Sequence, residues 1–193
     1  MTFDPVHACV LAFQGLYPVD QAGRTALEQL ARVQTMVRGE TIQPAGQPCR
    51  TLYFVAKGSV RIHSMPDGHD VTERIVLAGG FAARGESLFD QSPVEKGIEC
   101  LEDGVLVALP TPALFAAFEA HRPLERAFYK MVEQDYVRQI KRLERIQTLS
   151  PAERYARLLD EEPELLQHVP LKHLASYLGI TPESLSRIRA RRT

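Results

Sequence analysis

The residues best suited to recognition chemistry lie near the end of the chain, in the stretch GITPESLSRIRARRT. Glu183 and Arg187 are four residues apart, so on a helix their side chains lie next to each other on one face. Arginine can donate two hydrogen bonds to guanine O6 and N7, and glutamate can accept one from cytosine N4. These two residues therefore have the chemistry to distinguish base pairs in the major groove of DNA.

The flanking sequence predicts a helix-turn-helix that would present this face outward. Gly179 follows the first helix, where a residue tolerant of positive φ is needed. Thr181 is a typical N-cap for the second helix, and Pro182 occupies its first position. Leu185 and Ile188 are expected to point inward from the second helix. The expected buried face of the first helix consists of Leu171, Leu174, Ala175 and Leu178.

We expect the outer face of the second helix to contact DNA. Between residues 171 and 193 five basic residues stand against one acid, a net charge of about +4 with histidine neutral, whereas the whole chain carries −1. Such a local excess of basic charge is typical of a surface that contacts phosphates. The alternative is a solvated arginine-rich helix without a nucleic-acid partner. The candidate DNA-binding residues are Thr181, Glu183, Ser184, Ser186, Arg187 and Arg191.

Composition places the chain among ordinary globular proteins. It has 193 residues, of which 45% are hydrophobic and 24% charged. No apolar run is long enough to span a bilayer and no secretory signal is recognisable, so we expect a cytoplasmic protein without a membrane partner. Cys9, Cys49 and Cys100 are scattered and form no CxxC pair, which favours buried, reduced thiols over disulfides or an iron–sulfur cluster. We predict no cofactor and no bound metal.

The elements that must position the second helix can be outlined from periodicity. An amphipathic helix is expected at about residues 20–33, with Leu27, Leu30 and Ala31 inward. Glycine and proline then cut residues 34–110 into short β-rich runs. Many short strands at regular spacing favour an antiparallel barrel or jelly roll. Strands are expected at 51–56, 59–64, 71–77 and 105–109.

A long helix is predicted at about residues 123–148, after a shorter one at 111–119. Its single apolar stripe is typical of a helix that pairs with a second copy of itself. The alternative is a helix that packs wholly against its own barrel. The expected dimer-interface residues are Phe128, Val132, Leu143 and Ile146.

A capping box, Ser150-Pro151-Ala152-Glu153, predicts that a new helix begins there and runs to about Glu161. A short helical piece at 164–168 follows, before the helix-turn-helix. We therefore expect an α+β chain with three parts. These are a domain at 1–122 with an antiparallel β jelly roll or barrel, a dimerisation helix at 123–149, and a helix-turn-helix domain at 150–193.

This order of barrel, long helix and helix-turn-helix resembles the Crp/Fnr family of bacterial transcription regulators. LYFVAKGSVRIH at 52–63 resembles the strand–glycine–strand motif of the family's cyclic-nucleotide-binding-like barrel, and GITPESLSRIR resembles its recognition helix. The resemblance implies a homodimer that binds a palindromic operator in double-stranded DNA, with Glu183 and Arg187 on base edges. It also implies a small-molecule effector site in each barrel, and RNA polymerase is a candidate partner.

The effector site is where the chain departs most from the family. GGFAARGESL at 79–88 is similar to the family's phosphate-binding segment. Cyclic-nucleotide binders carry an arginine followed by Ser or Thr after it, to hold the cyclic phosphate, but SPVEKGIE at 92–99 has no arginine. An anion there would meet Glu95 unless Lys96 compensates. We therefore expect that cAMP is not the effector. The candidate effector residues are Gly85, Glu86, Ser87 and Lys96.

Two other functions remain open at this point. One is a small-molecule sensor or interaction module that has lost specific DNA binding. The other is a cupin-type enzyme, for which His63, His69 and Glu73 are the nearest approach to a metal-binding set, although their spacing lacks the His-x-His pair. No nucleophile elbow or P-loop is present. We therefore predict no catalytic residues and no enzymatic activity.

Overall fold

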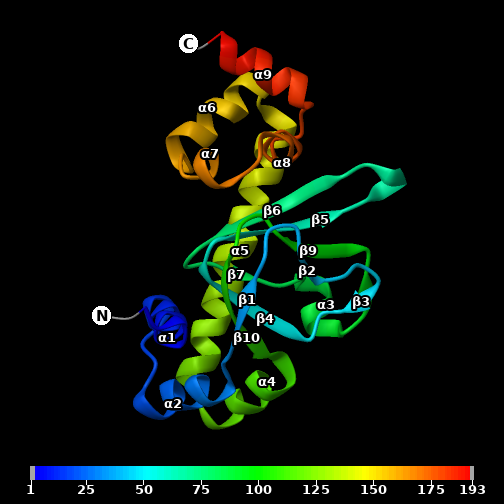
Figure 1. The fold of residues 1–193 in the computed structure, drawn as a ribbon. Helices are drawn as coiled ribbons and strands as arrows, with labels where there is room; N and C mark the ends of the chain where they lie inside the picture. The colour runs from blue at the N-terminus through cyan, green and yellow to red at the C-terminus, as the bar shows by residue number, and fades with distance from the viewer. Residues whose placement is uncertain (1–2, 192–193) are drawn as a thin grey trace.

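The computed structural model describes residues 3–191 (Figure 1). Two N-terminal helices lead into a β-barrel, and a short helix and a long one lead out of it to a C-terminal helical domain. The helices are α1 (Pro5–Leu16), α2 (Gln21–Leu30), α3 (Gly85–Asp90), α4 (Thr111–Ala120), α5 (Arg122–Thr148), α6 (Pro151–Glu161), α7 (Leu165–His168), α8 (Leu171–Tyr177), α9 (Pro182–Ala190) and the 3₁₀ turn η1 (Pro66–Gly68). The strands are β1 (Arg32–Met36), β2 (Thr41–Gln43), β3 (Gln47–Pro48), β4 (Thr51–Lys57), β5 (Ser59–Ser64), β6 (Val71–Leu77), β7 (Phe81–Ala82), β8 (Pro93–Val94), β9 (Lys96–Cys100) and β10 (Gly104–Pro110).

Two antiparallel four-stranded sheets form the barrel, in the orders β1-β10-β4-β7 and β2-β9-β5-β6. Strand β4 is buried on both faces. Leu52 and Phe54 contact the helices outside the barrel, whereas Tyr53 and Val55 point into the space between the sheets. This explains why LYFVA is continuously apolar rather than alternating. The centre of the core between the sheets consists of Val55, Val60, Ile98 and Leu106.

A second core lies outside the barrel, where α1, α2, α4 and the first half of α5 cover β4 and β10 (Figure 1). Helix α1 was not predicted from the sequence, although its start signal is present. The Asp4 carboxylate accepts hydrogen bonds from the backbone N–H groups of Val6 and His7 at 2.9 and 3.1 Å, and Pro5 is the first helical residue. The N-cap and the proline together stabilise the start of this helix.

The expected α+β fold, with an antiparallel barrel, a long helix and a C-terminal helix-turn-helix, is confirmed. The expected strands at 51–56, 59–64, 71–77 and 105–109 correspond to β4, β5, β6 and β10. The expected long helix is α5, and the helix predicted from the capping box is α6. In that box the Ser150 hydroxyl and the Glu153 carboxylate each accept a hydrogen bond from the other residue's backbone.

Two local predictions are wrong. The helix expected at residues 20–33 ends at Leu30, and Val33 lies in the edge strand β1, opposite Val107 of β10. Pairing with a distant strand overrides helical periodicity here. Leu171 is 44% exposed, because it is the first residue of α8 and lies at the rim of the helical core. The buried face of α8 consists of His173, Leu174 and Ala175.

The C-terminal domain packs on the barrel through α8 and β6 (Figure 1). The Ser176 hydroxyl accepts a hydrogen bond from the Thr72 N–H at 2.8 Å and donates one to the Asp70 carbonyl oxygen at 3.0 Å. His173 is buried at the same contact, with Nδ1 3.8 Å from an Asp70 carboxylate oxygen. Leu101 of the barrel is part of the hydrophobic core of the C-terminal domain. The two domains therefore share both polar and apolar contacts.

Burial of His173 makes stability depend on pH. Desolvation lowers the pKa of His173 from 6.5 to about 4. Between about pH 6.5 and pH 4 the unfolded chain therefore binds a proton at His173 that the folded chain excludes. The free energy of unfolding is not affected above pH 6.5, and it falls progressively as the pH falls towards 4. Between about pH 7 and pH 4 we expect the free energy of unfolding to fall by on the order of 1–3 kcal/mol more in the wild type than in His173→Gln. Urea denaturation at both pH values measures this, and an equal pH dependence of the two proteins would contradict it.

Within residues 3–191, no helix is long and apolar enough to cross a membrane. In the same part of the chain, no three His, Cys, Asp or Glu side chains lie close enough together to hold a metal ion. Cys9, Cys49 and Cys100 are free thiols, and all are buried. Burial raises the pKa of Cys9 and of Cys100 to about 12, which keeps both as unreactive thiols at neutral pH.

Candidate nucleic-acid interface

Helix α9 is fixed to the C-terminal domain by its start and by one apolar side. Gly179 adopts a φ of +67° in the turn after α8, which a larger residue would resist. The Thr181 hydroxyl then caps α9, accepting a hydrogen bond from the Ser184 N–H at 3.2 Å. Leu185 is buried and Ile188 half-buried against the other helices. These contacts leave the opposite side of α9 facing solvent.

The solvent-facing side of α9 carries the predicted DNA-binding residues. Glu183, Ser186 and Arg187 are exposed, as are Thr181 and Arg191 at the two ends of the helix. Helix α9 lies at the end of the molecule farthest from α2 and α4, so the barrel does not cover it (Figure 1). A hydrogen bond from its own backbone N–H lowers the pKa of Glu183. Glu183 is therefore a carboxylate, able to accept a hydrogen bond from a base.

Ser184 differs from the other five candidates because it is half-buried and already engaged. Its hydroxyl accepts a hydrogen bond from the Thr181 hydroxyl at 3.2 Å and another from the Arg187 guanidinium at 3.2 Å. In this structure Ser184 therefore orients Arg187 rather than projecting from the helix.

Arg154 of α6 was not singled out from the sequence. It donates to the carbonyl oxygens of Leu149 at 2.8 Å and Gly179 at 3.4 Å, and so ties the turn before α9 to the end of α5.

The predicted effector residues separate into two groups. A cavity of about 450 Å³ opens between the β5–β6 hairpin and the segment after α3, and it is lined by Glu86 and Lys96 but not by Gly85 or Ser87. The Lys96 ammonium pairs with the carboxylates of Glu73 at 3.2 Å and Glu86 at 3.1 Å. Lys96, the cation expected to compensate for the acids at this site, is therefore already paired.

Ser87 is a structural residue, and its assignment to the effector pocket is wrong. Its side chain is fully buried, and its hydroxyl accepts a hydrogen bond from the Cys49 N–H at 2.6 Å. The sequence pattern could not show this because Cys49 is distant along the chain. Gly85 is exposed at the start of α3, next to Glu86, but it does not line the cavity itself.

We expect Ser87→Ala to lower the free energy of unfolding by about 1–3 kcal/mol, because the Cys49 N–H would remain buried without a partner. Chemical denaturation followed by circular dichroism measures the change. The matched control is Ser186→Ala on the exposed side of α9, which should change stability by no more than about 0.5 kcal/mol. Equal stability of the two variants would show that the Ser87 hydroxyl contributes nothing.

An arginine close to the pocket, Arg84, is held by backbone carbonyl oxygens. Arg84 is buried, and its guanidinium donates to the carbonyl oxygens of Lys96 at 2.6 Å, Pro44 at 3.2 Å, Val94 at 3.3 Å and Gln47. It therefore holds the loops around the pocket together and is not available to an anionic ligand. The cavity itself is lined by the carboxylates of Glu73, Glu86 and Glu95 and by one lysine. Burial and the nearby Arg61 lower the pKa of His63, which favours its neutral form.

Helix α5 presents an exposed apolar stripe, but not the one predicted. Phe128 is 0% exposed and packs against Phe115 and Phe118 of its own chain, so its assignment to a dimer interface is wrong. Val132 contacts the same core, and Ile146 lines the space between α5 and the C-terminal domain. Leu143 is exposed as expected. The exposed stripe consists of Tyr129, Tyr136, Ile140 and Leu143, each between 46% and 65% exposed.

The exposed stripe has the spacing of a coiled coil. Its members are separated by seven, four and three residues. This matches the a and d positions of a heptad repeat, which face a partner helix. The sequence could not distinguish this stripe from the core-facing side, because both sides of α5 carry apolar residues. The structure separates them by showing which side the N-terminal helices cover.

Comparisons with known proteins agree with this architecture. Residues 33–121 match the cyclic nucleotide-binding domain family. FixK2 from Bradyrhizobium japonicum is 20% identical, with a TM-score of 0.73 over 83% of each chain. CLP from Xanthomonas campestris, a c-di-GMP responsive global regulator, is 21% identical, with a TM-score of 0.69 over 89% of this chain and 91% of that one.

A Crp/Fnr-family transcriptional regulator from Eubacterium rectale is 17% identical, with a TM-score of 0.71 over 90% of this chain and 85% of that one. No curated protein matches the sequence. The similar structures span the barrel, the long helix and the C-terminal helices together. Residues 33–121 are thus similar to a cyclic nucleotide-binding domain, and the chain shares the fold of these three solved regulators.

Proposed function

We propose that this protein is a DNA-binding transcription regulator of the Crp/Fnr type, with α9 as its recognition helix. The observation that carries the proposal is the exposed side of α9, where Glu183 and Arg187 lie side by side on the end of the molecule away from the barrel. A helix of this width enters the major groove, where an arginine and a carboxylate can read guanine and cytosine. The arginines at the end of the helix would contact phosphates and set the orientation.

The proposed active form is a homodimer, joined along the exposed stripe of α5. Pairing of two stripes would bury apolar side chains that each chain alone leaves in water. A two-fold dimer presents two recognition helices in opposite orientations, so its operator would be a palindrome with two half-sites. The dimer interface then lies directly below the C-terminal domains, and a change in helix packing would change the spacing of the two recognition helices.

The experiment that tests the proposal is selection of bound sequences from a random duplex pool by the full chain. We expect enrichment of a palindrome whose half-sites are separated by about one helical turn of DNA. The same measurement reports binding, specificity and dimer spacing. Equal, weak binding of selected and random duplexes would instead favour a sensor or interaction module without specific DNA binding. A stoichiometric metal in the purified protein would support an enzyme of the cupin type.

We further propose that cAMP does not regulate this protein. The cavity of about 450 Å³, called here the effector cavity, presents three carboxylates and a lysine already paired with two of them, while Arg84 is held by backbone carbonyls. A cyclic phosphate would therefore meet net negative charge and no free guanidinium. We expect about 1 mM cAMP to change operator affinity by less than about twofold, because a ligand shifts an equilibrium only by its differential affinity. Fluorescence anisotropy with labelled operator measures this, and a tenfold or larger shift would contradict it.

A further inference from the structure

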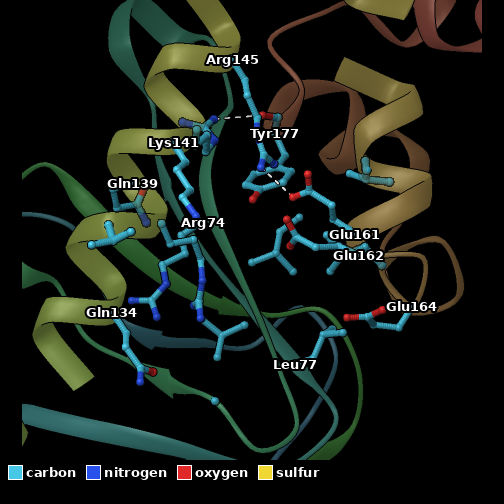
Figure 2. Close-up of a pocket in the computed structure, with 18 of the residues that line it drawn as sticks. Arg74, Leu77, Gln134, Gln139, Lys141, Arg145, Glu161, Glu162, Glu164 and Tyr177 are labelled. Carbon is cyan, nitrogen blue, oxygen red and sulfur yellow. Dashed lines mark hydrogen bonds and ion pairs between the residues drawn. The ribbon is translucent and has the colours of Figure 1, made fainter. Parts of the chain in front are cut away.

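A second and larger cavity lies between the two domains. It has a volume of about 850 Å³ and is enclosed by α5, by the α6–α7 segment and by the turn after β6 (Figure 2). We call it the interdomain cleft. It shares no lining residue with the effector cavity. Its volume lies in the range of sites that bind small molecules in other proteins.

One wall of the interdomain cleft is strongly basic. Arg138, Lys141 and Arg145 follow one another along α5 about one turn apart, and Figure 2 shows Lys141 and Arg145 directed into the cleft. Arg74 of β6 lies below them. Within the described residues, the Lys141 ammonium forms no ion pair and no side-chain hydrogen bond. Arg138 forms a long ion pair with Asp135, at 3.9 Å, and that carboxylate is already bound to Arg74 at 2.9 Å. The wall therefore carries more positive charge than its own acids neutralise.

The opposite wall is acidic, and an ion pair joins it to the basic wall. Glu161 and Glu162 at the end of α6 face α5 across the cleft, and Glu164 lies beside them (Figure 2). The Arg145 guanidinium binds the Glu161 carboxylate at 2.6 Å. In the whole lining, seven side chains are basic and four are acidic. An anion on the α5 wall would therefore be attracted by the net charge of the cleft, whereas a cation would be repelled.

The sides of the interdomain cleft also include apolar surface. Leu77, Ile146 and Tyr177 line it together with the charged residues. The Arg142 guanidinium lies 4.9 Å above the Tyr177 ring and donates to the Tyr177 carbonyl oxygen at 2.9 Å, so this cation is committed to holding α8. The positions left to contact a ligand are the basic wall of α5 and the apolar surface beneath it. A site with a few convergent charges on an apolar base is typical of small-molecule binding.

We propose that the interdomain cleft binds a small, multiply charged anion, bearing phosphate or several carboxylates, through Arg138, Lys141 and Arg145. The guanidinium groups of Arg138 and Arg145 can bind phosphate or carboxylate bidentately, and the Lys141 ammonium adds a point charge. The bound anion competes with Glu161 for Arg145. Occupancy therefore loosens the ion pair that joins the C-terminal domain to α5, and the cleft is a second site at which a ligand acts on the position of that domain.

The test is isothermal titration calorimetry of the full chain at low salt, with inorganic pyrophosphate and with citrate as separate probes. We expect Arg138→Gln and Lys141→Gln each to weaken binding about tenfold, as for loss of one charged contact. Glu161→Gln removes the competing carboxylate and should strengthen binding several-fold, so the two kinds of variant change affinity in opposite directions. Binding of pyrophosphate alone identifies a phosphate ligand, and binding of citrate alone a polycarboxylate.

Two controls separate this site from general attraction of anions. Lys57→Gln changes the same charge on an exposed barrel residue, and Arg187→Gln changes an arginine of α9; neither should alter the affinity for the probes. Failure of both probes to bind overturns the proposal, as does binding that Lys141→Gln and Glu161→Gln leave unchanged. The titration contains no DNA, so either failure leaves the proposed transcription function standing.

Discussion

Ile140→Glu should convert the protein from a dimer into a monomer at micromolar concentration. Ile140 belongs to the exposed stripe on α5, and in a two-fold dimer joined along that stripe it would lie against or near its own copy. The dimer would bury the exposed half of each Ile140, which contributes about 0.7–1.5 kcal/mol per copy, and a carboxylate in its place adds a desolvation cost of about the same size in each copy. The expected loss of about 3–6 kcal/mol corresponds to about two to four orders of magnitude in the dimer dissociation constant.

Analytical ultracentrifugation over a range of protein concentrations measures this change. The matched control is Val33→Glu, which introduces the same charge at an exposed aliphatic residue on the edge strand β1, away from the stripe. The control should dimerise like the wild type. Circular dichroism of both variants checks that α5 remains helical. If Ile140→Glu remained a dimer, the two copies would associate through another surface, and the proposed role of the stripe would be wrong.

Arg187→Ala should weaken binding to the selected operator about thirtyfold or more. Loss of a bidentate contact with guanine costs about 1–3 kcal/mol in each half-site, and a dimer loses two such contacts, about 2–6 kcal/mol in total. The loss should be specific to one symmetric position of the operator, where base preference becomes relaxed. Binding to random duplexes should change far less, because phosphate contacts made by other arginines remain.

Competition between operator variants, measured by fluorescence anisotropy at fixed salt, distinguishes these effects. Arg38→Ala removes the same charge from an exposed barrel turn and serves as the control, with no change in base preference expected. Glu183→Gln should alter preference at a neighbouring base without a large loss of affinity, since it removes no positive charge. A uniform loss of affinity across all sequences in Arg187→Ala would mean that Arg187 contacts phosphate instead of a base.

The sequence alone supports the prediction for Arg187 on α9, but not the prediction for Ile140 on α5. The recognition face follows from local signals: a glycine with positive φ, an N-cap at Thr181, and an apolar side formed by Leu185 and Ile188. Each of these acts within a few residues, so it can be read directly from the chain. The dimer stripe has no such local signal. Phe128 and Tyr129 are both aromatic neighbours on α5, yet one is in the core and the other in solvent.

By itself the sequence determined the strands β4, β5, β6 and β10, the length of α5, the capping box before α6 and the outer face of α9. These depend on periodicity and on turn chemistry, which act along the chain. Only the tertiary structure decided which side of α5 remains exposed, that Ser87 and Arg84 bind backbone groups, and that α5 and α6 enclose a charged cleft. The physical reason is that burial and pairing depend on neighbours distant in sequence: Cys49 for Ser87, the N-terminal helices for Phe128, and Glu161 for Arg145.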